Sequence, residues 1–230
     1  MSIKQRLQKI TGEIEKTCRS CGRSADEVTL VAISKTKPEE DILEAFSAGQ
    51  MHFGENRAKE LQDKMEQIQE EGIQWHFVGN LQTNKIKYMV EWVNWIESIH
   101  KKKALKEVEK RASEINRHIN VLIQVNISDE DQKSGCDPDD LGKILEYGQD
   151  LKFTHVRGLM GMATFTDDLE KVRDEFRLLS SLREKHLDKE KGNVSLEHLS
   201  MGMSNDFHVA IEEGSTMIRI GTAIFGERNY

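Results

Sequence analysis

The stretch TLVAISKTK, Thr29 to Lys37, joins an apolar run to a lysine at its end. The run is β-branched or apolar on both faces, which is typical of a parallel strand covered by helices. An amine that directly follows a buried strand is unusual, because desolvation penalises the charged form. We therefore predict a strand over 28–34 whose carboxyl end presents Lys35.

Further apolar runs repeat along the chain and alternate with polar, periodic segments. This alternation indicates parallel strands joined by helical crossovers. About eight strands favour a closed (β/α)8 barrel of the TIM type, with an extra N-terminal helix around 2–19. An open doubly wound sheet is the alternative, but the glycine-rich turn after its first strand is missing. The predicted strands are 28–34, 50–54, 74–79, 93–98, 119–127, 153–161, 194–199 and 216–220, and the helices between them are 38–48, 56–70, 83–90, 101–117, 138–149, 167–187 and 205–213.

The size and composition of the chain fit one globular domain over residues 1–230. A net charge of −7 argues against a nucleic-acid platform, which usually carries a basic surplus. The basic run Lys101–Lys103 opens a predicted helix of alternating charge and is interpreted as a solvated face. No stretch has the length and apolar character of a signal peptide or a membrane span, so we expect a cytoplasmic protein.

The three cysteines and one acidic loop are the candidates for metal or redox chemistry. Cys18 and Cys21 form a CxxC, but no second ligand pair accompanies them, and Cys136 stands alone. Asp129, Glu130 and Asp131 resemble a metal cluster, yet their place in a loop beside Lys133 favours solvation. We predict no metal site.

Active sites of such barrels lie at the carboxyl ends of the strands, where Lys35 is expected. A lysine with its stem in an apolar wall has a lowered pKa, and its neutral amine can form a Schiff base with a carbonyl compound. The alternative is a lysine that extends into solvent. Lys37 serves as the comparison, since the neighbouring Pro38 and acids make it an ordinary first-turn residue.

The last two strands end in residues suited to an anion. Ser204 is predicted to cap the helix over 205–213, and Gly221 and Thr222 follow the last strand. Backbone amides, hydroxyls and a glycine form a phosphate cradle, and this position in barrels is a recurrent phosphate site. A ligand with an aldehyde at one end and a phosphate at the other would join the cradle to Lys35. Pyridoxal 5′-phosphate (PLP) fits, and Arg219 would then lie near its ring and keep the ring nitrogen unprotonated. The alternative for Arg219 is a structural ion pair.

Other polar residues carry weaker signals. Asn56 either contacts the cofactor or caps the following helix. His76 and His198 alternate with apolar strand residues and are interpreted as interior histidines, whereas His208 is interpreted as a structural residue of its helix.

The sequence also resembles a known family. The motifs SKTKP, HFGENR, WHFVGNLQTNK, VNISDEDQKSG, RGLMGM, LSMGMSNDF and MIRIGTAIFGERNY are similar to those of the pyridoxal phosphate homeostasis proteins, in the same order. The resemblance implies a fold-type III PLP barrel like the N-terminal domain of alanine racemase. It implies that Lys35 holds PLP as a Schiff base and that Arg219 faces the pyridine nitrogen. The other implied contacts are Asn56 beside the ring, and Ser204, Gly221, Thr222 and Ser200 at the phosphate.

The resemblance implies a role in cofactor supply, in which PLP is bound, stored and passed to apo-enzymes, with no catalytic residue. A PLP-dependent amino-acid racemase is the alternative, but racemisation needs a second base, which the racemase takes from a further C-terminal domain. A cofactor-independent Schiff-base aldolase is a third hypothesis, and a spectrum of bound PLP would exclude it. Lys133 is a candidate for the hand-off of PLP, and we expect a monomer.

Overall fold

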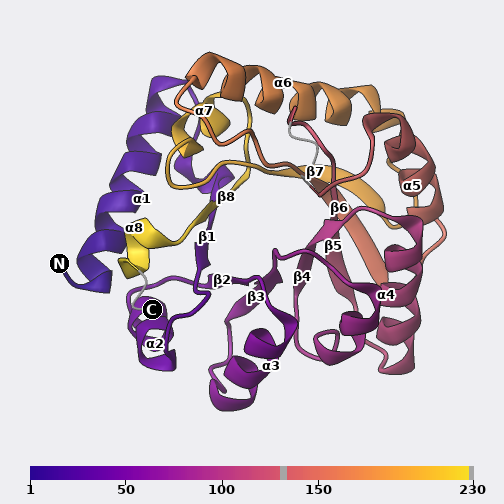
Figure 1. Ribbon diagram of the computed structural model, residues 1–230, viewed down its shortest axis with the longest axis horizontal. Helices are drawn as coiled ribbons and strands as arrows, with labels where there is room; N and C mark the ends of the chain where they lie inside the picture. Colours follow the sequence, from indigo (N-terminus) through magenta and orange to yellow (C-terminus); the bar gives the residue numbers. More distant parts are fainter. Residues whose placement is uncertain (130–133, 228–230) are drawn as a thin grey trace.

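The computed structural model describes residues 1–129 and 134–227. Within these ranges, eight parallel strands pair in sequence order and close into one barrel (Figure 1). The predicted (β/α)8 barrel is confirmed, and each predicted strand is present within a few residues of its expected bounds. The strands are β1 (Thr29–Ile33), β2 (His52–Glu55), β3 (Gln74–Phe77), β4 (Trp95–Ile99), β5 (Ile119–Gln124), β6 (Thr154–Met160), β7 (Val194–Ser200) and β8 (Met217–Ile220).

Helices surround the strands (Figure 1). The segment predicted as a helix over 83–90 forms a short 3₁₀ helix, η2 (Thr83–Tyr88), instead of an α-helix. The α-helices are α1 (Ile3–Ser20), α2 (Glu39–Ser47), α3 (Ala58–Gln67), α4 (Lys102–Glu114), α5 (Leu141–Gly148), α6 (Leu169–Lys185), α7 (Phe207–Glu212) and α8 (Thr222–Phe225).

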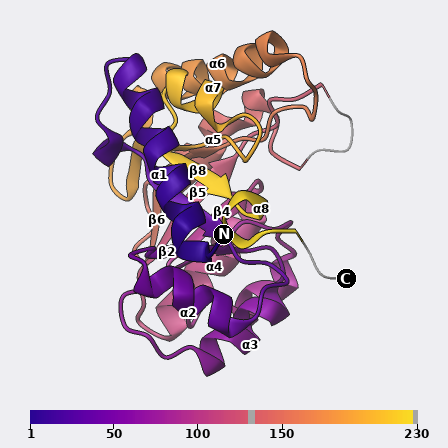
Figure 2. The same ribbon diagram turned by 90° about the vertical axis from the view of Figure 1, so that its left-hand side faces the viewer.

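The extra helix α1 covers the seam where β8 meets β1. Its buried residues Ile3, Leu7, Ile10 and Ile14 recur every three or four positions and so share one face. The helix that follows β8 is the short α8, which covers little of the barrel. Helix α1 covers this part of the barrel and packs against α8, α2 and α7 (Figure 2). It is fixed there by Arg6, whose Nε donates to the carbonyl of Ile224.

The prediction that Ser204 caps the following helix is wrong. Helix α7 begins at Phe207, and the residue at its N-cap position is Asp206. The amides of Asp206 and Phe207 both donate to the carbonyl of Met203, which closes a turn over residues 204–206 before the helix starts. Ser204 therefore belongs to this turn, which leads from β7 into α7.

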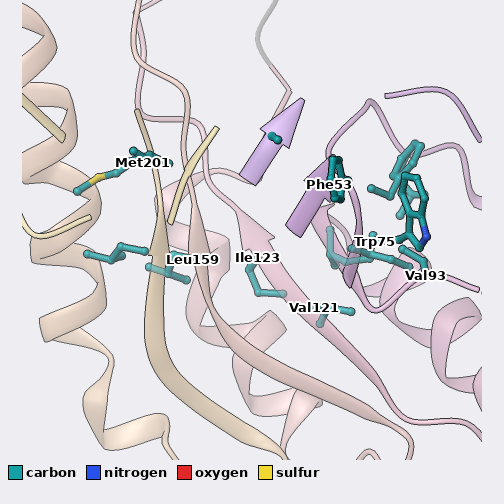
Figure 3. Close-up of a cluster of buried hydrophobic side chains, with 14 of the residues drawn as sticks. Phe53, Trp75, Val93, Val121, Ile123, Leu159 and Met201 are labelled. Carbon is teal, nitrogen blue, oxygen red and sulfur yellow. The ribbon is translucent and has the colours of Figure 1, made fainter. Parts of the chain in front are cut away.

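The apolar core has two parts, because successive strand residues point to opposite faces of the barrel wall. Val121 and Ile123 of β5 face the surrounding helices and belong to the larger cluster (Figure 3). Leu122, between them, belongs to a smaller cluster of buried residues. The interior is otherwise polar, since it contains several charged and hydrogen-bonding side chains. The second cluster consists of Trp95, Leu122, Met160 and Met217.

The cysteines are free thiols. Burial raises the pKa of Cys18, which lies on the buried face of α1, and raises that of Cys136 to about 12. Neither is activated as a thiolate. In the described part of the chain, no helix combines the length and apolar character needed to cross a bilayer.

Candidate functional site

Closure of the barrel brings the two predicted ends of the ligand site together. Strand β1 pairs with β8, and Ala32 lies opposite Ile220. Lys35 is three residues beyond Ala32, and Gly221 and Thr222 directly follow Ile220. The amine and the expected anion cradle thus emerge from adjacent strands at the same end of the barrel.

A cavity of about 480 Å³ lies at this end of the barrel. Its size is within the range of small-molecule sites, which is roughly 300–1,000 Å³. Five of the predicted site residues line it together, namely Lys35, Ser204, Arg219, Gly221 and Thr222.

One wall of this cavity consists of hydrogen-bond donors for which the described residues provide no acceptor. The amides of Ser204 and Asn205 in the turn before α7, and those of Thr222 and Ala223 at the start of α8, donate to no group in the described ranges. The hydroxyls of Ser204 and Thr222 form no hydrogen bond with described residues either. An anion with several oxygens would satisfy these donors, so the wall fits a phosphate group.

Two glycines lie at close approaches of the backbone along this wall. A Cβ on Gly221 would lie 3.1 Å from the carbonyl oxygen of Ile33, tighter than most contacts of such atoms. Gly202 has a φ of +96°, and a Cβ there would lie 2.5 Å from the Cβ of Ala210. The turn that presents Ser204 therefore depends on a residue without a side chain.

Arg219 lies behind the cavity with only 4% of its surface exposed. Its Nη1 donates to Ser200 Oγ at 2.5 Å, and its Nη2 donates to the carbonyl of Gly161 at 3.0 Å. Ser200 in turn donates to the carboxylate of Glu97 at 2.5 Å. Ser200 is fully buried and acts here as the link between two charges, whereas the resemblance implied a phosphate contact.

Glu97 is a buried carboxylate inside the barrel that supports Arg219. Its Oε2 lies 3.9 Å from Arg219 Nη1, and its Oε1 is 2.6 Å from Nδ1 of His76. Burial by itself raises the pKa of Glu97, but the hydrogen bond and charge of His76, with those of Arg219 and Ser200, lower it overall. Burial lowers the pKa of Arg219, and Glu97 opposes this effect. The carboxylate thus keeps the guanidinium charged and in place.

The hydrogen-bonded chain continues from His76 to His52, whose Nδ1 lies 2.9 Å from His76 Nε2. The interpretation of His76 as an interior histidine is confirmed, since it is fully buried and stacks on Trp95. Burial, and then the neighbouring His76, lower the pKa of His52 to about 4. Glu97 raises it and His198 lowers it by smaller amounts.

This lowered pKa predicts a loss of stability in mild acid. Below about pH 6.5 His52 becomes protonated in the unfolded chain, whereas in the folded protein it becomes protonated only near pH 4. The free energy of unfolding should therefore fall between these two values, as measured by urea unfolding at several pH values. A His52→Asn variant should lose part of this dependence, whereas His208→Asn, at an exposed position, should keep it. An unchanged profile in the His52 variant would contradict the assignment.

A second buried cluster fixes the backbone on both sides of Lys35. Lys64 of α3 donates to Glu55 Oε1 at 2.7 Å, to the carbonyl of Ser34 at 2.8 Å and to Glu60. Ser34 Oγ also donates to Glu55, and Glu60 accepts the amide of Thr36. Thr36 has a φ of +63°, which is uncommon for a residue with a side chain. The cluster thus holds residues 34 and 36 while Lys35 points into the cavity.

Sequence reasoning missed this cluster. No sequence pattern marks Lys64 and Glu55 as part of a site. Lys64 in particular lies on a helix with many charged residues, where a lysine is ordinary. Only their burial, 7% exposed for Lys64 and 0% for Glu55, distinguishes them. Burial raises the pKa of Glu55 even though Lys64 and Ser34 lower it.

The interpretation of Lys37 as an ordinary first-turn residue is wrong. Helix α2 begins at Glu39, and Lys37 lines the same cavity as Lys35. Its Nζ donates to the carbonyls of Phe225 at 3.1 Å and Glu227 at 2.8 Å. Lys37 therefore anchors the chain after α8 across the mouth of the barrel.

The other candidates lie apart from this cavity. Asn56 lines a neighbouring cavity beyond β2 and β3. His198 is partly buried, with its ring against the edge of Trp95. Asp129 pairs with Lys171 at 3.0 Å, while Glu130, Asp131 and Lys133 lie outside the described residues. Within the described ranges, no three His, Cys, Asp or Glu residues are grouped so that they could hold a metal ion.

Known proteins that are similar to this chain in sequence and structure agree with one another in family and fold. Residues 8–229 match the family described as alanine racemase, N-terminal domain. The pyridoxal phosphate homeostasis protein of Aquifex aeolicus is 43% identical over the whole of both chains. PipY of Synechococcus elongatus, solved with PLP bound, is 32% identical with a TM-score of 0.85, over 98% of this chain and 100% of that one. Alanine racemase from Corynebacterium glutamicum, at 16% identity and a TM-score of 0.71, shares the fold over 96% of this chain and 62% of its own.

Proposed function

Since the chain belongs to the pyridoxal phosphate homeostasis proteins of the alanine racemase N-terminal domain family, we propose that it binds PLP at Lys35 and keeps it for delivery to apo-enzymes. The observation that carries this proposal is the cavity at the β1–β8 seam, which brings the Lys35 side chain together with a wall of donors that no described residue satisfies. The relative solved with PLP bound supports the same ligand. When bound, PLP supplies an aldehyde that condenses reversibly with amines.

The residues of the cavity divide the task of binding between them. Lys35 provides the amine, and the backbone on either side of it is fixed by the Lys64 cluster. The amides and hydroxyls of Ser204 and Thr222, with Gly221 between strand and helix, hold the phosphate. Arg219 would face the ring nitrogen and leave it unprotonated, because a guanidinium does not release its proton at neutral pH.

We further propose that the protein does not turn over amino acids. A racemase needs a proton-transferring group on each side of the substrate. Among described residues, no histidine, tyrosine or cysteine lines the cavity of Lys35. The other titratable side chains there are Lys37, which holds two carbonyls, Asp206, which accepts the amide of Met203, and the buried Arg219.

The proposal predicts transfer without catalysis. Purified protein loaded with PLP should restore the activity of an apo-form PLP enzyme, and borohydride should fix PLP to the peptide that contains Lys35. The same protein mixed with L-alanine should form D-alanine no faster than free PLP at equal concentration, by chiral chromatography. A turnover of about 1 s⁻¹, the low end for ordinary enzymes, would establish the racemase alternative and overturn the carrier role.

A further inference from the structure

A second cavity, of about 570 Å³, lies next to the cofactor cavity at the carboxyl ends of β2 and β3. It is lined by residues of the motifs HFGENR and WHFVGNLQTNK, none of which lines the cavity of Lys35. The motifs pack tightly against each other, since a Cβ on Gly79 would lie 2.0 Å from the carbonyl oxygen of Asn56. The amide of Val78 also donates to the carbonyl of Glu55 at 2.9 Å. The wall is therefore a fixed part of the barrel.

The charged side chains on this cavity are all basic. Arg57, Lys59 and Lys85 line it, whereas no Asp or Glu among the described residues does. Lys59 is paired with Asp63 at 2.7 Å. Arg57 and Lys85 form no ion pair with any carboxylate in residues 1–129 and 134–227. Two cations on one concavity, neither in an ion pair with a described carboxylate, are unexpected on a chain of net charge −7.

The remaining lining offers hydrogen bonds and an apolar surface. The amide side chains of Asn80 and Gln82 line the cavity and donate to no described group. Tyr88, which is 42% exposed, supplies aromatic surface, whereas Phe77 is buried behind the lining with only 2% exposed. The amine of Lys85 lies 5.6 Å from the centre of the Tyr88 ring, which limits the positions of this amine. Amides and cations beside rings form a combination suited to a planar molecule with an anionic group.

We propose that this cavity binds a small organic anion, separately from the cofactor. Its phosphate or carboxylate contacts Arg57 and Lys85, and its planar body lies against the ring of Tyr88. Arg57 suits this task because its planar fork of donors matches both kinds of oxyanion. The site is independent of Lys35, so it exists whether or not the chain carries PLP.

The test is calorimetric titration of the full-length protein, loaded with PLP so that the cofactor cavity is filled. The probes are adenosine 5′-monophosphate, benzoate and adenosine, at low salt because screening weakens such contacts. The phosphate and carboxylate probes distinguish the two kinds of anion, and adenosine has a ring without the charge. We expect saturable binding of at least one anion and none of adenosine.

Variants locate the binding. Arg57→Gln and Lys85→Gln should each weaken it by about tenfold, as expected for a lost charged hydrogen bond. Lys87→Gln is the matched control, because Lys87 also lies over the Tyr88 ring, at 4.8 Å, but does not line the cavity. Its affinity should change less than about threefold. Absence of saturable binding by both anions, or equal weakening by Lys87→Gln, would overturn the proposal.

Discussion

The Lys35→Ala protein should be purified without the visible absorption band of covalently bound PLP, and borohydride should add no mass to its peptides. Lys35 follows β1 and provides the amine in a cavity whose other lining residues suit an anion and a planar ring. Its removal leaves only noncovalent contacts to the phosphate, so dialysis should remove PLP completely. Absorption spectra and peptide mass analysis after reduction measure both effects.

Lys37→Ala provides the matched control for this experiment. Lys37 lines the same cavity two residues away, but its amine is occupied by the carbonyls of Phe225 and Glu227. The variant should still capture PLP on Lys35. A reduced adduct that persists in Lys35→Ala, or disappears in Lys37→Ala, would move the attachment point and refute the assignment of Lys35.

Replacement of Lys64 by methionine should lower the free energy of unfolding more than any other substitution proposed for this protein. Glu55 is completely buried, and Lys64 is its cationic partner at 2.7 Å. Removal of one partner of a buried pair leaves the other charge uncompensated, which typically costs about 3–5 kcal/mol. Urea unfolding of Lys64→Met should show this decrease, and capture of PLP should become slower, because Ser34 loses the bond that fixes its carbonyl beside Lys35.

The same helix contains a control for this variant. Lys59 pairs with Asp63 at 2.7 Å, but both side chains are largely in solvent. Lys59→Met should therefore lower the free energy of unfolding far less than Lys64→Met, because exposed helical pairs contribute little to stability. Adding Glu55→Gln to Lys64→Met should recover part of the loss, since it removes the stranded charge. If Lys64→Met and Lys59→Met cost the same, the buried pair does not stabilise the fold.

The elements of the barrel were predictable because their signals are local. In a run such as VLIQVNI, positions 121, 123, 125 and 127 are all β-branched, which is typical of a strand with one face against covering helices, and its alternation with periodic polar segments indicates the parallel order. The details of helix ends were less predictable. Ser204 was assigned as a cap from residue type alone, but the turn closed by the carbonyl of Met203 delays the helix to Phe207.

The location of the cofactor site was predictable for a related reason. Lys35, Arg219 and Thr222 each stand at or just after the carboxyl end of a strand, and all such ends meet at one face of a barrel. The role of Lys37 was predicted wrongly because its partners are the backbone carbonyls of Phe225 and Glu227. These are far away in sequence, and any residue type has such a carbonyl, so the sequence does not reveal them.

The sequence by itself determined the order of strands and helices, the barrel and the face on which the site lies, because periodicity and strand ends are local properties. Only the tertiary structure decided what supports the site. Ser200 and Glu97 are 103 residues apart and meet inside the barrel, while Lys64 reaches Ser34 from a helix 30 residues later. Such pairs are indistinguishable from surface charges in the sequence, because a buried charge is recognised by the absence of water around it. That absence exists only once the barrel has closed.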